Sequence, residues 1–330
     1  MKRILLPLFT GFSLFSTSLT AAPLQRSLVA ADAKWVLHLD MASLQKSQLG
    51  ASLLKIAMDE VGEDLKEDMQ IDVPAIVAQI GSITAYGADF KPGPDGRGVL
   101  IWQGSKEVEQ VVRGLLVQQA EAGKSGQGGI KAVREGADPV YAVSSNVFVA
   151  VRPGRGILVS PKLEEIDDAS RVMDGKAPSL EEKTVFSEYP VLPGGFFFVA
   201  LAEAFAQNAG LPAQAEVLKL AEGGRVALGE EADKLQLSLN LKAQTAEGAT
   251  QIQQVLQGLV ALASFAHAEE PEMIQMKEWI RGTLVAVKEK MVSLDLNVTV
   301  DAVLKQLQDK IRPGAAPRKD PKELEAAKLR

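Results

Sequence analysis

Residues 235–265 read LQLSLNLKAQTAEGATQIQQVLQGLVALASF, and this stretch shows how the chain folds. In its first part every second residue is leucine, from Leu235 to Leu241, with polar residues between them. Successive side chains of a β-strand point to opposite faces, so a period of two is typical of a strand with one buried and one solvated face. The stretch therefore begins with an amphipathic strand.

A helix is predicted directly after this strand. Thr245 stands at the position of a helix N-cap, and Glu247 lies in the first turn, where the helix dipole favours an acid. Between Ile252 and Val260 the apolar residues recur at spacings of three and four, which places them on one helical face. The pattern predicts a strand that leads straight into a helix, each with one face to bury.

A second copy of this strand–helix unit is predicted nearer the N-terminus. The strand, cap and first-turn residues of the two copies match at an offset of 140 positions. In the first copy they are Val99, Ile101, Ser105 and Glu107, and in the second they are Leu239, Leu241, Thr245 and Glu247. The apolar helix residues of 108–116 match those of 252–260 at an offset of 144. Two further pairs of stretches are similar, 85–87 with 227–229 and 149–151 with 285–287. Four matches in the same order predict an internal duplication.

Residues 1–22 are predicted to form a secretory signal peptide. A basic start at Lys2 and Arg3 precedes an apolar core over 4–15, and a small-residue cleavage site, Thr-Ala-Ala, ends at Ala22. The apolar run is short for a membrane span. No cysteine follows the cleavage site, which excludes a lipid attachment there. We expect export to the periplasm or the exterior of a bacterial cell, and a soluble mature chain.

The composition excludes several classes of function. The 36 basic and 42 acidic side chains give a net charge of −6, and loss of the two basic residues of the signal peptide makes it −8. An acidic protein lacks the basic surface that nucleic-acid binding needs. Without cysteine, the chain has no disulfide, no thiolate metal site and no cysteine nucleophile. No later apolar run is long enough for a transmembrane helix.

The order of the predicted elements favours an α+β fold, built from duplicated units of antiparallel strands packed with helices. The expected first half covers residues 23–180 and the second covers 181–311, because prolines and glycines concentrate around the boundary. The pattern leaves open whether the halves share one sheet. Residues 312–330, with three prolines and a net charge of +3, are predicted to form a disordered basic tail.

The remaining elements are predicted from turn residues, helix starts and alternation. Strands are expected near 34–39, 83–90, 98–102, 140–144, 146–152, 156–160, 196–201, 283–288 and 292–300, with a hairpin over 225–242. Helices are expected after Asp40, from Pro74 to about residue 80, over 105–121, 162–173 and 203–221, from Pro271, and after Asp301 as N-cap.

The strongest candidate for catalysis is a pair on the first predicted strand. His38 and Asp40 are two residues apart, so they share a strand face, and Asp40 could orient the imidazole. With a hydroxyl such as that of Ser43 they would make a hydrolytic site. The alternative is that Asp40 caps the following helix and His38 is a half-buried strand residue. The matching strand of the second half, at 199–201, lacks both groups, which favours the alternative.

Other residues that suggest chemistry are better explained by structure, and neither a metal nor a cofactor is predicted. His267 has only neighbouring acids as partners, which is a weak metal site. The run 123–125 resembles the end of a phosphate-binding loop, but Gln118 stands where the motif needs glycine. Arg152 and Arg155 could bind an anion, but the proline and glycine between them indicate a hairpin turn.

Leu100 and Trp102 are the predicted binding surface. At the offset of 140 they match Asn240 and Lys242, so the first copy has apolar side chains on a strand face that is polar in the second. Such a face needs a cover, which is a helix, the other half of the chain or a partner. Where internal cover is missing, we expect self-association or the binding of another protein through this face.

Three features of the sequence carry a resemblance to a group of known proteins. They are the signal peptide, the opening strand-to-helix stretch Trp35-Val-Leu-His-Leu-Asp40 and the strand–helix repeat. With these features the chain resembles uncharacterised exported bacterial proteins with duplicated α+β units. The resemblance implies no activity.

Together these observations predict a non-catalytic binding or envelope-assembly module, whose partner is an unidentified protein or envelope component. The alternative is a hydrolase that uses His38 and Asp40. The surroundings of His38 separate the two hypotheses. An open cleft that also holds a hydroxyl favours the enzyme, whereas a packed ring with Asp40 bonded to backbone amides favours the module.

Overall fold

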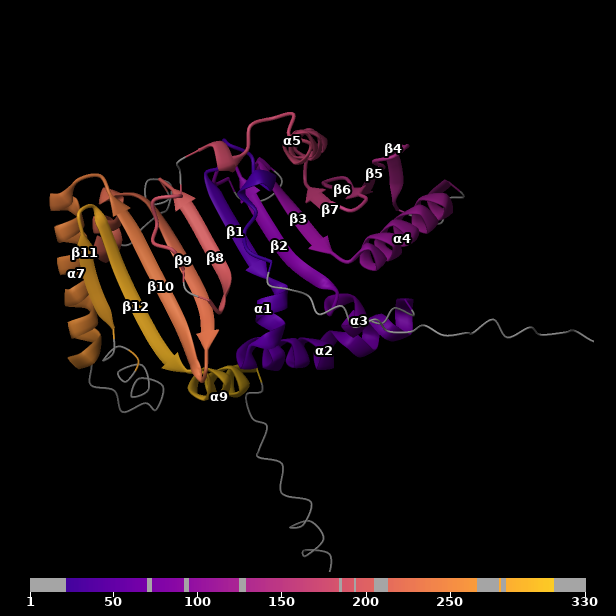
Figure 1. Cartoon of the computed structure of the whole chain (residues 1–330). Helices are drawn as coiled ribbons and strands as arrows, with labels where there is room; N and C mark the ends of the chain where they lie inside the picture. The colour runs from indigo at the N-terminus through magenta and orange to yellow at the C-terminus, as the bar shows by residue number, and fades with distance from the viewer. Residues whose placement is uncertain are drawn as a thin grey trace, which may run out of the picture.

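The computed structural model describes residues 22–69, 73–91, 95–124, 129–183, 186–192, 194–204, 213–265, 279 and 283–311. The predicted signal peptide except Ala22, the residue His267 and the tail 312–330 lie outside the described residues, as does nearly all of the helix expected from Pro271. Figure 1 shows the described elements arranged around one wide sheet.

The strands, in chain order, are β1 (Trp35–Asp40), β2 (Ile80–Gly87), β3 (Gly98–Gly104), β4 (Lys131–Arg134), β5 (Val140–Ser144), β6 (Val147–Arg152), β7 (Gly156–Ser160), β8 (Phe196–Glu203), β9 (Ala221–Glu231), β10 (Lys234–Ala243), β11 (Leu284–Lys288) and β12 (Met291–Thr299). The α-helices are α1 (Met41–Lys46), α2 (Gln48–Met69), α3 (Val73–Val77), α4 (Lys106–Lys124), α5 (Leu163–Met173), α7 (Ala246–Phe265) and α9 (Val300–Ile311). Short 3-10 helices are η1 (Arg26–Leu28), η3 (Leu180–Glu182) and η4 (Ala213–Leu220).

The strands of the described residues form one twelve-stranded sheet in the order β11-β12-β10-β9-β8-β1-β2-β3-β7-β6-β5-β4. Every pairing in it is antiparallel. At its centre β1 pairs with β8, from Trp35 opposite Ala202 to Leu39 opposite Phe198. Because this pairing joins the two predicted halves, they share one sheet, a point that the sequence left open. The fold is α+β, as predicted.

The strand order is the same on both sides of the central β1–β8 pair. Counted outward, β2, β3, β7 and β6 on one side correspond to β9, β10, β12 and β11 on the other. In each half a long helix follows the second of these strands, α4 after β3 and α7 after β10. The similar stretches 85–87 and 227–229 lie on β2 and β9, and 149–151 and 285–287 lie on β6 and β11. The first half has β5 and β4 in addition.

One lateral row of side chains crosses the whole sheet and is apolar at every position. Residues opposite each other in antiparallel strands point to the same face, so the pairings trace the row from edge to edge. We call it the apolar row, and from β11 to β4 it consists of Val285, Leu294, Leu239, Val226, Ala200, Leu37, Ala85, Leu100, Val159, Val149, Tyr141 and Ala132.

The apolar row corrects the predicted strand alignment of the two copies by one residue. The offset of 140 matched Leu239 with Val99, but Leu239 shares its row with Leu100, and Val99 points to the opposite face. The predicted second copy has one residue more between Leu241 and the helix cap Thr245 than the predicted first copy has between Trp102 and the cap Ser105. A shift of one residue exchanges the two faces of a strand. Leu100 and Trp102 therefore correspond to Leu239 and Leu241 of β10, which lie on the face of the apolar row, and not to its polar residues.

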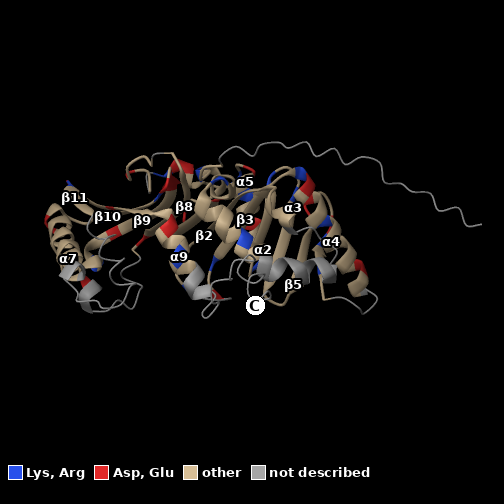
Figure 2. Ribbon diagram, turned by 90° about the horizontal axis from the view of Figure 1, so that it is seen from below, with Lys and Arg blue, Asp and Glu red and all other residues tan. Residues whose placement is uncertain are grey.

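Different helices cover the two faces of the sheet. On the face opposite the apolar row, α5 and η1 pack over the first half against Ile101 and Leu158. On the face of the apolar row, α4 covers one side around Trp102 and Leu116, and α7 with η4 covers the other side around Leu241. Figure 2 shows α7 and α5 on opposite faces. Helices α1, α2 and α9 pack around one end of the strands.

Side-chain caps begin the helices that follow β1, β3 and β10. Thr245 Oγ1 accepts a hydrogen bond from the backbone N–H of Gly248 over 2.9 Å, and Ser105 Oγ accepts one from that of Val108 over 3.3 Å. Asp40 caps α1 in the same way. These caps agree with the sequence analysis. Each satisfies a backbone donor that the first helical turn leaves without a partner.

Three predicted boundaries are wrong. Instead of a helix over 203–221, β8 continues to Glu203, and η4 and β9 follow from Ala213. The strand predicted over 83–90 spans Ile80–Gly87, and Asp301, predicted as a cap, lies in the first turn of α9. Strand β4 was not predicted. Strand ends depend on where the neighbouring strand stops offering hydrogen bonds, and alternation along one strand does not show this.

Replacing Thr245 by alanine tests the predicted cap. Thr245→Ala removes the acceptor for the Gly248 N–H, and we expect the free energy of unfolding to fall by about 1 kcal/mol. Thr245→Ser keeps a hydroxyl and is expected to keep most of the stability. Denaturant unfolding of both variants measures the difference, and an equal loss in both would show that the cap does not stabilise α7.

Candidate functional site

A large hollow lies on the face of the apolar row, beside the central strand pair. This main cavity has a volume of about 580 Å³, and its wall residues come from β1, β8, β9, β10, η4 and the loop after β2. The wall is almost wholly apolar, and it includes Leu37 and Val226 of the apolar row and Leu241 beside it. Leu37 is 42 % exposed, which is unusual for a large apolar side chain on a central strand.

Small residues of the central strands make this space. Ala200 of the apolar row and Ala202 beside it lie between larger residues, and Gly224 opposite Ala202 has no side chain. Trp35, on the other side of Ala202, lies over Gly87, where an added Cβ would come within 2.6 Å of the indole ring. The indole therefore covers β2, and the space above β8 and β9 stays open.

A second hollow continues the main cavity along the apolar row. This side cavity has a volume of about 440 Å³, and Leu100 and Val159 of the row are among its wall residues. The two hollows share Trp35, Asp89 and Lys91 as wall residues. The two cavities are therefore neighbours on the face of the apolar row, and we call them together the central groove.

Asp89 and Lys91, in the loop after β2, border both cavities; Arg225 also borders the main cavity, and Arg97, Asn146 and Ser160 border the side cavity. The Asp89 carbonyl accepts a hydrogen bond from Trp35 Nε1 over 2.6 Å, which holds the indole in place. The Asp89 carboxylate accepts the backbone N–H groups of Arg97 and Lys91, each over 3.2 Å. The bond from Arg97 is the main reason why the pKa of Asp89 lies below its usual range. Phe90 and Lys91 are exposed beside it.

His38 and Asp40 lie on the opposite face of β1, away from the central groove. His38 is 3 % exposed, and both of its ring nitrogens have partners. Nδ1 is 2.9 Å from Thr84 Oγ1, and Nε2 is 2.9 Å from the carbonyl oxygen of Ala22. Burial is the main cause of a lowered pKa for His38, so the ring is neutral at neutral pH.

Asp40 uses its carboxylate on backbone amides and one hydroxyl. Oδ1 accepts the backbone N–H of Ser43 over 2.9 Å, and Oδ2 accepts the Ser43 hydroxyl over 2.8 Å and the backbone N–H of Ala22 over 2.9 Å. None of the described cavities has His38 in its wall. This packed arrangement is the one that we expected for the binding module and not for the hydrolase.

Leu100 and Trp102 point to the face of the central groove but have different surroundings. Trp102 packs in the cluster under α4 together with Leu116 and Ile157, so part of the chain covers it. Leu100 is half-buried and belongs to the wall of the side cavity. The sequence singled out both residues, and the structure brings only Leu100 to the groove.

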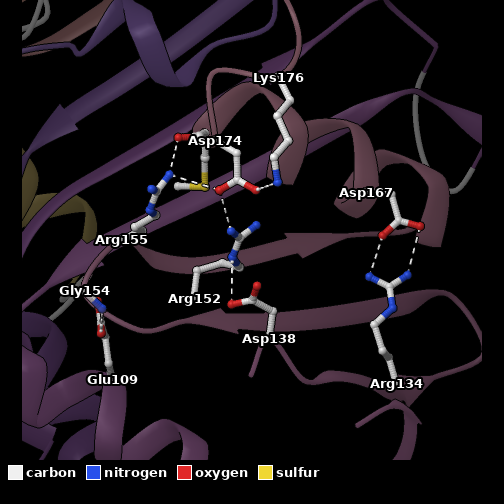
Figure 3. A network of polar contacts seen from close by, with 10 residues as sticks. Glu109, Arg134, Asp138, Arg152, Gly154, Arg155, Asp167, Asp174 and Lys176 are labelled. Atoms are coloured by element: carbon white, nitrogen blue, oxygen red, sulfur yellow. Dashed lines mark hydrogen bonds and ion pairs between the residues drawn. The ribbon is translucent and has the colours of Figure 1, made fainter. Parts of the chain in front are cut away.

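Arg152 and Arg155 are both engaged in ion pairs, which Figure 3 shows. Arg152 is 2.7 Å from Asp174 and 3.1 Å from Asp138, and Arg155 is 3.1 Å from Asp174. The backbone N–H of Gly154 also donates to Glu109 over 2.7 Å. These contacts fasten the β6–β7 turn to the end of α5 and to α4. The arginines serve the turn, as the sequence analysis favoured.

Sequence analysis missed most of the groove residues. It placed Trp35 and Leu37 on one strand face, but it gave no sign that Ala200 and Val226 would lie beside them. The only available signal was the small residues at positions 200, 202, 223 and 224, in strands that otherwise carry large ones. That signal becomes informative only after the strands are paired.

The fold and the groove define an α+β protein with an open apolar cavity at the centre of one antiparallel sheet. Within the described residues no helix combines the length and the apolarity needed to cross a bilayer, and no three acidic or histidine side chains there are grouped to hold a metal ion.

Comparison with known proteins adds little. No family model matches the sequence, and no curated protein matches it. One of two matching solved chains comes from a structure titled "Structure of crystal form I of TP0453". It is 10 % identical in sequence, the TM-score is 0.43, and the match covers 88 % of this chain and 98 % of that one.

The pH dependence of stability tests the packed state of His38. Its folded pKa lies below the unfolded value of 6.5, so below about pH 6.5 the unfolded chain binds a proton that the folded chain does not. His38 therefore stabilises the fold fully above that pH, and its contribution falls as the pH drops, by up to about 1.4 kcal/mol per pH unit. Denaturant unfolding between about pH 7.5 and pH 5 should show a shallower fall in His38→Gln than in the unaltered chain. Equal slopes would contradict a buried neutral ring.

Because Trp102 is packed under α4 and Leu100 borders a cavity, we expect their truncation to lower the free energy of unfolding by different amounts. Trp102→Ala empties a packed site under α4, and we expect the free energy of unfolding to fall by about 3 kcal/mol. Leu100→Ala borders an existing hollow and should cost about 1 kcal/mol. Denaturant unfolding and size-exclusion chromatography of both variants measure this. Small losses in both, together with a change in oligomeric state, would instead make the pair a contact surface.

Proposed function

We propose that this chain is an exported, non-catalytic binding module of the bacterial envelope, and that it holds the acyl chain of an amphiphile in the central groove. The observation that carries the proposal is the groove itself, which is open and mainly apolar, with a few polar groups such as those of Asp89 and Lys91 in its walls. Most small-molecule sites in proteins are concave apolar cavities of several hundred Å³ with a few polar groups that orient the ligand.

The shape and chemistry of the groove favour an extended apolar chain. Its floor is the central part of the apolar row, from Leu239 to Val159, and this floor crosses seven strands without a polar side chain. Lys91 at the rim offers a cation to the head group of such a ligand. Each buried methylene contributes about 0.8 kcal/mol, so several of them offset the entropy cost of association.

A hydrolase that uses His38 and Asp40 receives no support from the geometry. A catalytic base needs a free ring nitrogen beside its substrate, but both ring nitrogens of His38 are bonded within the fold. The Ser43 hydroxyl donates to Asp40 and not to the histidine. A nucleophilic pair of serine and histidine is therefore not formed.

Export and duplication belong to the same proposal. The sequence of residues 1–22 supports export to the periplasm or the cell exterior. The equal strand order on both sides of β1–β8 supports an ancestral unit that was copied, with the β4–β5 hairpin as an addition to one copy. In this scheme the groove lies at the junction of the copies, because β1 and β8 each begin one of them.

Binding of fatty acids of increasing length tests the proposed ligand. The probe is cis-parinaric acid, a fluorescent fatty acid, which saturated acids from about eight to sixteen carbons displace in competition. We expect the dissociation constant to fall about fourfold per added methylene until the groove is full, and then to level off. No binding of the probe, or an affinity independent of chain length, would overturn the proposal.

Two variants of the apolar row localise the binding. Ala200→Phe fills the main cavity and is expected to weaken binding at least tenfold, whereas Ala132→Phe makes the same change at the exposed end of the row, on β4, and should have no effect. Lys91→Met should weaken a fatty acid more than the fatty alcohol of the same length. Equal binding by both alanine variants would place the ligand elsewhere. A dimer that dissociates when the probe binds would show that a second copy occupies the groove instead.

A further inference from the structure

A built site on the face opposite the groove holds the backbone of a single residue, Ala22. Its N–H donates to Asp40 Oδ2, and its carbonyl oxygen lies at His38 Nε2, each over 2.9 Å. His38 and Asp40 are 3 % and 5 % exposed. Two buried polar side chains thus engage both backbone groups of one residue near the start of the described chain. A buried polar group without a partner costs about 1–3 kcal/mol, so these contacts keep Ala22 in place.

The Asp40 carboxylate in this site has no cation opposite it. Its partners among the described residues are the amides of Ala22 and Ser43 and the Ser43 hydroxyl, and none of the ion pairs found there involves it. A buried carboxylate is costly unless a positive charge compensates it. The nitrogen of Ala22, 2.9 Å from Asp40 Oδ2, would carry such a charge if it were the N-terminus of the mature chain.

We propose that the signal peptide is cut between Ala21 and Ala22, and that the new N-terminal ammonium group forms an ion pair with Asp40. The step is hydrolysis by the signal peptidase of the exporting cell. Water adds across the amide bond, Ala21 keeps the carboxylate, and the nitrogen of Ala22 takes up protons to become an ammonium group. The hydrogen bond from Ala22 to Asp40 then becomes a charge-assisted one, which is roughly twice as strong. This inference rests on the export part of the proposed function and is independent of the ligand.

This site of cleavage differs by one residue from the one that the small-residue pattern favours. A cut after Ala22 would leave Pro23 as the first residue and would remove both partners of the site. His38 Nε2 and Asp40 Oδ2 would then be buried with no protein group in their place.

Mass spectrometry of the N-terminal peptide, from the protein exported by its native cell, tests the site of the cut. The expected first residue is Ala22. A mature chain that begins at Pro23 or later would overturn the inference but would leave export intact. A full-length chain that still begins at Met1 would overturn both. Binding of cis-parinaric acid is measured on the same sample, so the ligand proposal is judged separately.

Thermal unfolding of three purified mature chains tests the ammonium group. The chains begin at Ala22, at a glycine added before Ala22, and at Pro23, and a removable N-terminal fusion leaves each start without extra residues. The added glycine keeps the amide N–H but moves the charge away. We expect the chain that begins at Ala22 to unfold about 2–4 °C higher than the other two. Three equal midpoints would overturn the role of the charge.

Asp40→Asn in the same three chains provides the matched control. It removes the carboxylate charge but keeps an oxygen for the cap of α1, so the advantage of the chain that begins at Ala22 should disappear. Asp32→Asn, at an exposed position, should leave the advantage unchanged. An advantage that survives Asp40→Asn would show that the ammonium group is bound elsewhere.

Discussion

The antiparallel pairing of β1 with β8 is the constraint on which the rest of the structure depends. These strands lie about 160 residues apart in the chain, and they join two groups of strands that would otherwise be separate sheets. At the end of the pair Lys34 accepts a backbone hydrogen bond from Glu203, and the two side chains form an ion pair of 3.2 Å. The register also decides which side chains share a face. A slip by one residue would break the apolar row at its centre and turn His38 toward the groove.

The two faces of β1 show how one strand serves two purposes. On one face its residues are buried by the N-terminal segment and η1, and polar groups there are fully bonded within the fold. On the other face Leu37 remains partly open, because its neighbours Ala200 and Ala85 are too small to enclose it. Within the described residues, bonded polar groups and a partly open apolar surface thus lie on opposite faces of the same strand.

The sequence predicts the parts of this fold that depend on local patterns. The alternating leucines before Thr245, the caps at Thr245 and Ser105, and the α+β class all follow from residues close together in the chain. The match between β3 and β10 was wrong by one residue for a physical reason. Alternating apolar and polar residues indicate that a strand has two faces, but they do not show which face packs against the helix. The groove could not be predicted at all. It depends on the lateral neighbours of Ala200 and Trp35, and these come from strands far away in the sequence.

The central position of β1 has a consequence for how the chain reaches its final state. The first strand to be made is the one that lies in the middle of the sheet, and its second neighbour is complete only after residue 203 has been synthesised. Closing so long a loop is entropically costly, and topologies with many distant contacts fold slowly. In the proposed export, a centre that forms late would keep the chain unfolded until a translocation channel accepts it.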